Sequence, residues 1–140
     1  MNKKKTGSRS GIFLTEIMLA ILFFALISAI CLKIFAESRQ LSSDAGNLND
    51  AVAAAITVSE AFQNANNPSD AVKSMEKSFE IINAGENHGE IPLENTALLL
   101  TYDVAPSKEV AGITCIWIEV KNGDKAVYRL TREVYYGEEI

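Results

Sequence analysis

The chain has 140 residues, enough for one small domain beside a membrane segment. Its formal net charge is −5, from 18 acidic and 13 basic residues, and four of the bases lie in the first 11 residues, which hold no acid. The remainder is therefore strongly acidic. This distribution argues against direct nucleic-acid binding, which needs a basic face on the folded part of a protein.

An apolar run follows the basic tip. From Ile17 to Leu32 the only polar residues are Ser28 and Cys31. A helix of about 20 residues is about 30 Å long, which matches the hydrocarbon core of a bilayer. The run is too long for a secretory signal peptide, and no small-residue cleavage site follows it. Because Lys and Arg gather on the cytoplasmic side of membrane spans, we expect residues 12–35 to cross the cell membrane once, with the N-terminus inside and the C-terminal domain outside.

The segment Gly11-Ile-Phe-Leu-Thr-Glu16 joins the basic tip to the apolar run. A basic leader that ends in Gly, a Glu five positions later and an apolar helix beyond the Gly together resemble the N-terminal signature of type IV prepilins. The resemblance implies that residues 1–11 are a leader, that prepilin peptidase cleaves between Gly11 and Ile12, and that the new amino group of Ile12 is methylated. The chain departs from the family pattern at Ile12, usually Phe or Met, and at Thr15, usually an aliphatic residue.

Glu16 is the acidic residue at the start of the apolar run. A carboxylate in the bilayer costs about 2.5–3.5 kcal/mol at the centre of a helix and less near its end. Cleavage would create a partner, because the Ile12 amine of one subunit can face the Glu16 of its neighbour in a filament. The resemblance therefore makes Glu16 a subunit-assembly residue. The alternative is that Glu16 extends to the membrane interface, as charged side chains near the ends of spans do.

One long helix is predicted from Leu14 to about Asn64, and the leader before it is expected to lack regular structure. The first Pro is Pro68, which cannot continue a helix. Residues 36–66 form the exported half of this helix. Apolar residues recur there at helical spacing and predict a stripe that packs on the rest of the domain, made of Leu41, Leu48, Val52, Ala55, Ile56 and Phe62.

Residues 67–140 are predicted to form a small α+β domain. A short second helix is expected at Ser69–Asn83 with Ser69 as its N-cap, followed by a loop at Glu86–Glu94. Three antiparallel strands are then expected, with Asn122-Gly123 as a hairpin turn: Thr96–Val104, Ile113–Lys121 and Lys125–Tyr135. The expected fold class is α+β and pilin-like, a long helix packed on a small antiparallel sheet of about three strands.

The exported part offers no catalytic or cofactor motif, so we expect neither an enzyme nor a cofactor. Its single histidine, His88, is expected in a solvated loop without other ligands at metal-binding spacing. The acidic and amide side chains of residues 86–95 could supply oxygen ligands to calcium, but their spacing matches no EF-hand. Trp117 and the pair Tyr135–Tyr136 are expected in the core and at the sheet edge rather than in a ligand platform; exposed, they would form a contact surface. The two cysteines, Cys31 and Cys115, are expected to stay unpaired.

With the resemblance, the sequence predicts a structural subunit, a minor pilin or pseudopilin of a type IV pilus, competence or type II secretion-like filament. The expected partners are prepilin peptidase, other pilins in a helical filament, an inner-membrane assembly platform with a cytoplasmic ATPase, and membrane lipid before assembly. The irregular signature and the lack of Gly or Pro in the membrane helix favour a minor subunit. The alternative is an uncleaved, signal-anchored extracytoplasmic binding protein that never assembles.

Overall fold

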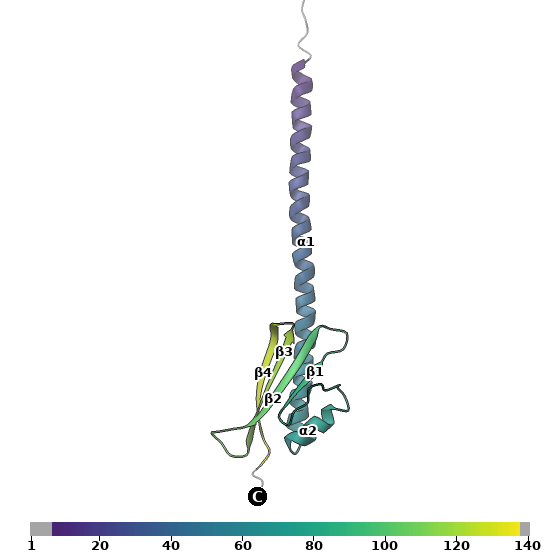
Figure 1. The fold of residues 1–140 in the computed structure, drawn as a ribbon. Coiled ribbons are helices and arrows are strands. Elements are labelled where there is room, and N and C mark those ends of the chain that lie inside the picture. Colours follow the sequence, from purple (N-terminus) through teal and green to yellow (C-terminus); the bar gives the residue numbers. More distant parts are fainter. Residues whose placement is uncertain (1–6, 138–140) are drawn as a thin grey trace, which may run out of the picture. The chain divides into compact units, whose positions relative to one another are not determined.

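The structure is a computed structural model that describes residues 7–137. Within these residues the chain forms an α+β fold of two helices and four strands (Figure 1). It divides after Ser43 into two compact units, the N-terminal unit and the C-terminal unit, and the first helix contributes to both. The elements are α1 (Gly7–Asn64), α2 (Pro68–Met75), β1 (His88–Pro92), β2 (Leu98–Pro106), β3 (Ile113–Asn122) and β4 (Lys125–Tyr135). The predicted fold class is confirmed, with four strands in place of three.

The described part of the N-terminal unit is helical throughout. The helix α1 begins at Gly7 instead of Leu14, so the expected lack of regular structure is wrong for residues 7–11. The physical reason is that this stretch contains no Pro, and each of its two glycines, Gly7 and Gly11, costs at most about 1 kcal/mol in a helix. The basic residues Lys3–Lys5 of the predicted leader lie outside the described residues.

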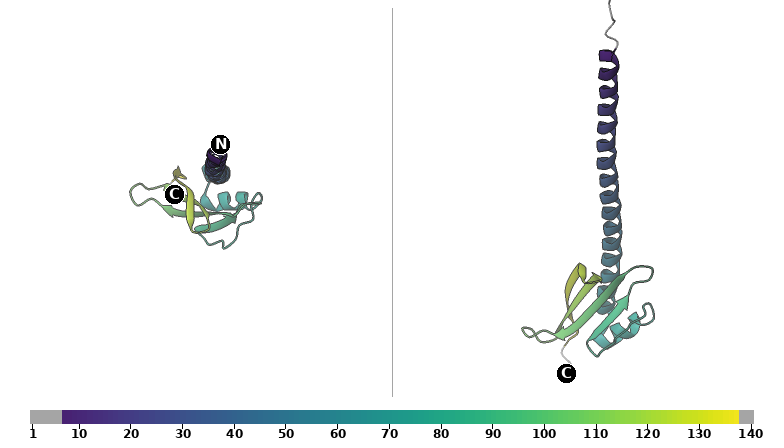
Figure 2. Two further views of the ribbon diagram at one scale, coloured as in Figure 1. Left: turned by 90° about the horizontal axis from the view of Figure 1, so that it is seen from above. Right: turned by 45° about the horizontal axis from the view of Figure 1, so that its top comes forward.

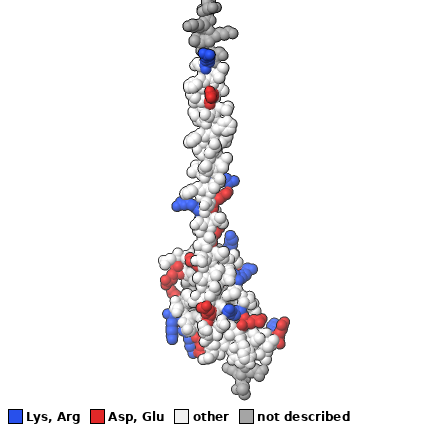
Figure 3. Space-filling model, turned by 180° about the vertical axis from the view of Figure 1, so that it is seen from behind, with Lys and Arg blue, Asp and Glu red and all other residues white. Residues whose placement is uncertain are grey.

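The apolar run of α1 exposes large side chains on every side of the helix, from Ile12 to Phe35. Figure 3 shows a mostly uncharged surface along this part of the helix. This segment is long and apolar enough to cross a membrane. A helix that is apolar all round is stable when lipid or other helices surround it.

The C-terminal unit contains one antiparallel sheet with the strand order β1-β2-β3-β4 (Figure 2). The part of α1 that belongs to this unit, from Asp44 onward, packs on one face of this sheet and encloses the core. The strands contribute buried apolar residues at alternate positions, namely Ile91, Leu98, Leu100, Tyr102, Val104, Ile116, Ile118, Val120 and Val134. The other face of the sheet carries mostly polar side chains.

The helix face that meets the sheet differs in part from the predicted stripe. Ala55 and Phe62 are buried, as predicted, whereas Leu41, Leu48 and Ile56 are exposed. The buried face consists of Ala51, Ala55, Val58, Ser59 and Phe62. Small residues suit this face because they let the helix backbone come close to the sheet, while larger apolar residues on the neighbouring face remain outside the core.

The helix α2 is shorter than predicted and begins one residue earlier. Its N-cap is Asn67, not Ser69, because the Asn67 side chain accepts a hydrogen bond of 2.8 Å from the backbone N–H of Asp70. Pro68 follows at the first helical position, where its fixed φ favours a helix start. The helix ends at Met75 rather than near Asn83, and Phe79 continues it only as a turn.

The turn between β3 and β4 consists of Gly123 and Asp124, with Asn122 paired to Lys125. The sequence predicts the hairpin turn at Asn122-Gly123, one residue earlier. The φ of Gly123 is +59°, and a glycine with positive φ at the first central position is typical of type II′ hairpins. In β3, which precedes the turn, Ile116 and Ile118 face the core.

The strand β1 occupies residues expected to form a loop. Its residues Glu90 and Ile91 pair with Thr101 and Leu100 of β2. Gly89, which suggested a loop, is needed here because a Cβ at this position would lie 2.4 Å from the hydroxyl oxygen of Tyr102. Glycine in a strand often marks such a close approach.

Replacing Gly89 with Ala is expected to lower the free energy of unfolding by about 1–3 kcal/mol, the usual cost of an overpacked core. The new methyl group would overlap the Tyr102 ring, which is fixed in the core with only 1% of its surface exposed. Urea unfolding of the full chain in detergent, followed by near-UV circular dichroism, measures the change. The control is Gly85→Ala, whose added carbon comes no closer than 3.6 Å to other atoms and should shift stability by less than about 0.5 kcal/mol.

Candidate functional site

The predicted processing segment lies inside α1. Gly11 is a helical residue, its φ is not in the left-handed region, and a Cβ there would meet nothing within 4 Å. Neither packing nor backbone conformation therefore requires glycine at this position, although glycine destabilises a helix by about 0.8–1 kcal/mol relative to alanine. The neighbouring Thr15 hydroxyl donates a hydrogen bond of 2.9 Å to the Gly11 carbonyl. The fold alone leaves the presence of Gly11 unexplained.

Ile12 and Glu16 lie four residues apart and so face the same side of the helix. Ile12 has 65% of its surface exposed, and Glu16 is also exposed. Among the described residues Glu16 takes part in no ion pair. From Gly11 to Glu16 the helix advances by about 7.5 Å. The three predicted site residues therefore form a short exposed segment at the start of the apolar run.

The far end of the apolar run carries a second group of charges. Lys33 and Glu37 form an exposed ion pair of 3.8 Å along the helix. The guanidinium of Arg39 lies 5.6 Å from the centre of the Phe35 ring, within the range of a cation–π contact. An apolar segment with charged residues at both ends is the pattern of a helix that spans a membrane.

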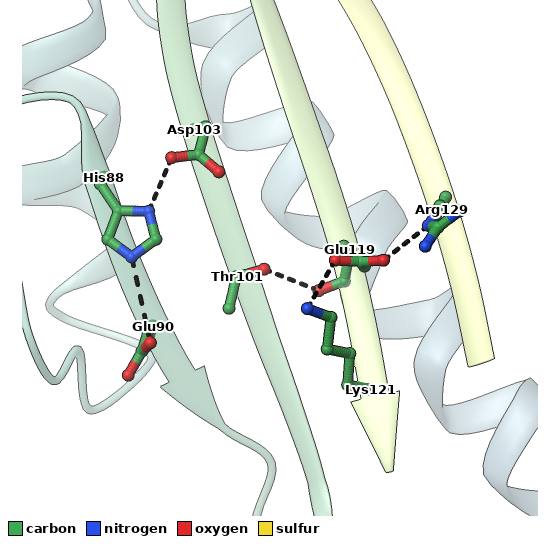
Figure 4. A network of polar contacts seen from close by, with 7 residues as sticks. All are labelled: His88, Glu90, Thr101, Asp103, Glu119, Lys121 and Arg129. Atoms are coloured by element: carbon green, nitrogen blue, oxygen red, sulfur yellow. Dashed lines mark hydrogen bonds and ion pairs between the residues drawn. The ribbon is translucent and has the colours of Figure 1, made fainter. Parts of the chain in front are cut away.

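A second candidate site, whose residues are not brought together by spacing along the chain, lies on the solvent-facing side of the sheet. We call it the outer sheet face. The strand register aligns its side chains in two rows that each cross all four strands (Figure 4 shows most of them). One row is His88, Asp103, Trp117 and Thr131, and the other is Glu90, Thr101, Glu119 and Arg129. The alternation within each strand was visible in the sequence, but the register between strands was not.

Ion pairs and hydrogen bonds link these rows. Glu119 binds the Nε of Arg129 and lies 3.0 Å from the Nζ of Lys121. Hydrogen bonds from Arg129 and then Lys121 hold the pKa of the Glu119 carboxyl below its usual value. The Nδ1 of His88 lies 2.7 Å from Asp103, and its Nε2 lies 4.0 Å from Glu90. The expectation of a solvated loop histidine is therefore wrong, because β1 places His88 beside β2.

Substitution of Glu119 by Gln should remove the contribution that the ionised Glu119 carboxylate makes to the free energy of unfolding. A folded-state pKa below the unfolded value of about 4.5 means that Glu119 stabilises the fold above that pH. This contribution disappears as the pH falls through the lowered folded-state pKa. Urea unfolding at pH 7 and at pH 3 should show Glu119→Gln less stable than the native chain at the higher pH, with a smaller difference at the lower pH.

The matched control for this prediction is Glu133→Gln. Glu133 is an exposed acid of β4 that forms no ion pair within residues 7–137. Its substitution should leave the pH dependence unchanged. Equal pH profiles for Glu119→Gln and the native chain would contradict the assigned hydrogen bonds.

Trp117 stands near the middle of the outer sheet face. It is 44% exposed, so the expectation that it belongs to the core is wrong. Around it lies a shallow hollow of about 310 Å³, lined by residues of β2, β3 and β4 that include Thr101, Asp103, Trp117, Glu119, Arg129 and Thr131.

Tyr135 is 68% exposed, as a sheet-edge residue can be. Tyr136 instead packs on the core, donates a hydrogen bond of 2.6 Å to the Phe62 carbonyl and has its pKa raised by burial.

The segment considered for calcium, residues 86–95, contains β1. The Oε2 of Glu90 accepts a hydrogen bond of 2.6 Å from the Asn83 side chain. Within residues 7–137 no group of three His, Cys, Asp or Glu side chains is close enough to hold a metal ion.

Comparison of the chain with protein-family models, with curated proteins and with solved structures finds no match.

Proposed function

We propose that this protein is a structural subunit of a type IV pilus-like filament, a minor pilin or pseudopilin that prepilin peptidase cleaves between Gly11 and Ile12. The observation that carries the proposal is Gly11. This glycine lies within a helix, has open space where a Cβ would be, and precedes by five positions the carboxylate of Glu16. A peptidase that requires glycine before the cut explains a residue that the fold does not need.

The apolar segment supports the same proposal. Its side chains are exposed on all sides of α1, so the segment needs lipid around it before assembly. In a filament the apolar segments of neighbouring subunits would pack together, and the burial lost on leaving the lipid would be recovered against other helices. The cytoplasmic ATPase of an assembly platform would supply the energy for this transfer.

The exposed position of Glu16 fits a role in assembly. On the helix surface its carboxylate is free to meet the Ile12 amine of a neighbouring subunit after cleavage. The ion pair would neutralise both charges within the apolar surroundings and would fix the axial register of adjacent helices. Before cleavage this amine does not exist, which would link processing to assembly.

The test is the N-terminus of the protein isolated from its native cells, read by mass spectrometry of the intact chain. The proposal expects a chain that begins at N-methylated Ile12. A chain that begins at Met1 or Asn2 overturns it and favours an uncleaved, signal-anchored protein. Two matched variants sharpen the result, since Gly11 and Gly46 are both helical glycines with open space beside them. Gly11→Leu should retain the leader, whereas Gly46→Leu should be processed normally.

A further inference from the structure

The only tryptophan of the chain is part of a polar surface. Trp117 faces solvent from β3, with Asp103 opposite it on β2 and Thr131 opposite it on β4. The next row places Glu119 and Arg129 beside it. A large, partly exposed aromatic ring among groups that can form hydrogen bonds is not needed for the core, which lies on the opposite face of the sheet.

The charged groups of this surface already have partners. Glu119 is paired with both Arg129 and Lys121, and Asp103 is hydrogen-bonded to His88 (Figure 4). These contacts hold the side chains in place, and the two cations beside Glu119 offset the charge of its carboxylate. A surface of this kind favours a neutral ligand with many hydroxyl groups over an ion. The paired carboxylates and the guanidinium still have free lone pairs and N–H groups for such a ligand.

We propose that the outer sheet face binds a neutral oligosaccharide, with Trp117 as the platform for one pyranose ring. The C–H groups on the face of a pyranose pack on an aromatic ring, and its hydroxyl groups both donate and accept hydrogen bonds. Asp103 and Glu119 supply acceptors, Arg129 supplies donors, and Thr131 supplies both. Hydrogen bonds to charged groups are stronger than hydrogen bonds between neutral groups, so they can hold a ligand that carries no charge of its own.

The shape of the hollow agrees with this ligand class. Its volume of about 310 Å³ is at the lower end of the range for small-molecule sites, about 300–1,000 Å³. It is shallow and lies across three strands, so a sugar chain can lie along the surface and continue beyond it. A cationic ligand is the competing possibility because Trp attracts cations through its ring. The two cations that already pair with Glu119, Lys121 and Arg129, argue against it.

The experiment is a fluorescence titration of the full chain, in which Trp117 is the only tryptophan and therefore reports directly on its own surface. A polyoxyethylene detergent keeps the membrane segment soluble without offering sugar headgroups. The probes are cellohexaose, chitohexaose, maltohexaose and laminarihexaose, with tetramethylammonium chloride as the cationic probe. The proposal expects a saturable change in Trp117 emission with at least one sugar at millimolar concentration and none with the cation.

Variants that keep Trp117 test the assigned contacts. Thr131→Val and Asp103→Asn preserve side-chain size and should each weaken sugar binding by about fivefold to tenfold. Tyr135→Phe, an exposed residue of β4 outside the hollow, should bind like the native chain. The proposal is overturned if no sugar gives a saturable change, if only the cation does, or if both hollow variants bind as the native chain does. The result does not depend on whether the leader is cleaved.

Discussion

Substitution of Phe62 by Ala is expected to lower the free energy of unfolding of the C-terminal unit by about 3–5 kcal/mol. Phe62 is fully buried, and its ring meets that of Tyr102 edge-on with centroids 5.6 Å apart. Its carbonyl also accepts the hydrogen bond from Tyr136, so the residue connects α1 with the end of the sheet. Small domains are stable by about 5–15 kcal/mol in total, which makes this loss a large fraction.

The measurement is urea unfolding of the full chain in detergent, followed by near-UV circular dichroism. The matched control is Ile56→Ala, one and two-thirds turns earlier on the same helix, because Ile56 is 45% exposed. It should cost less than about 1 kcal/mol. A cost for Ile56→Ala equal to that for Phe62→Ala would mean that the sheet packs on a different face of α1.

The elements predicted correctly from the sequence are those with strong local signals. Pro68 ends the long helix where the structure ends it, at Asn64. The β-branched and aromatic alternation of β3 and β4 predicts both strands within one residue of their observed ends. The hairpin turn is displaced by one residue because Gly123, rather than Asn122, takes the first central position. These elements can be predicted from the sequence because residues next to one another in the chain determine the backbone conformation there.

The elements predicted incorrectly depend on contacts between distant segments. Gly89 and Pro92 suggest a loop, but Tyr102 of β2 fills the space beside Gly89 and makes the segment a strand. On α1, hydrophobicity alone favours Leu48 and Ile56 for the core, but both are exposed, whereas Ala51, which is outside the predicted stripe, is buried. Side-chain size at the contact decides between these faces, and the size that fits is known only once the partner surface is known.

The two candidate sites differ in how far the sequence can predict them. Gly11, Ile12 and Glu16 are close together in the chain, so their spacing is visible without a structure, and their role stays a prediction. The outer sheet face combines residues from His88 to Thr131 that come together only through the register of four strands. Its ion pairs and its hollow could not be predicted from spacing along the chain.

Substitution of Glu16 by Gln is expected to reduce incorporation into filaments by more than about tenfold, while membrane insertion and cleavage stay normal. Gln has the shape of Glu but no charge, so in the proposed filament the Ile12 amine of the neighbouring subunit would be left in apolar surroundings without a partner. Removing one member of a buried ion pair costs about 3–5 kcal/mol, and each 1.4 kcal/mol corresponds to a factor of ten. The measurement compares filament and membrane fractions by immunoblot, with the N-terminus of each fraction read by mass spectrometry.

The control is Glu37→Gln at the opposite end of the apolar run. Glu37 forms an exposed ion pair with Lys33, a kind of contact that contributes at most about 1 kcal/mol, so this variant should assemble nearly as the native chain does. Normal incorporation of Glu16→Gln would show that the carboxylate serves another purpose, such as contact with the membrane interface. Reduced incorporation of Glu16→Gln in cleaved form, with normal Glu37→Gln, would separate the proposed assembly role of Glu16 from its place in the predicted cleavage signal.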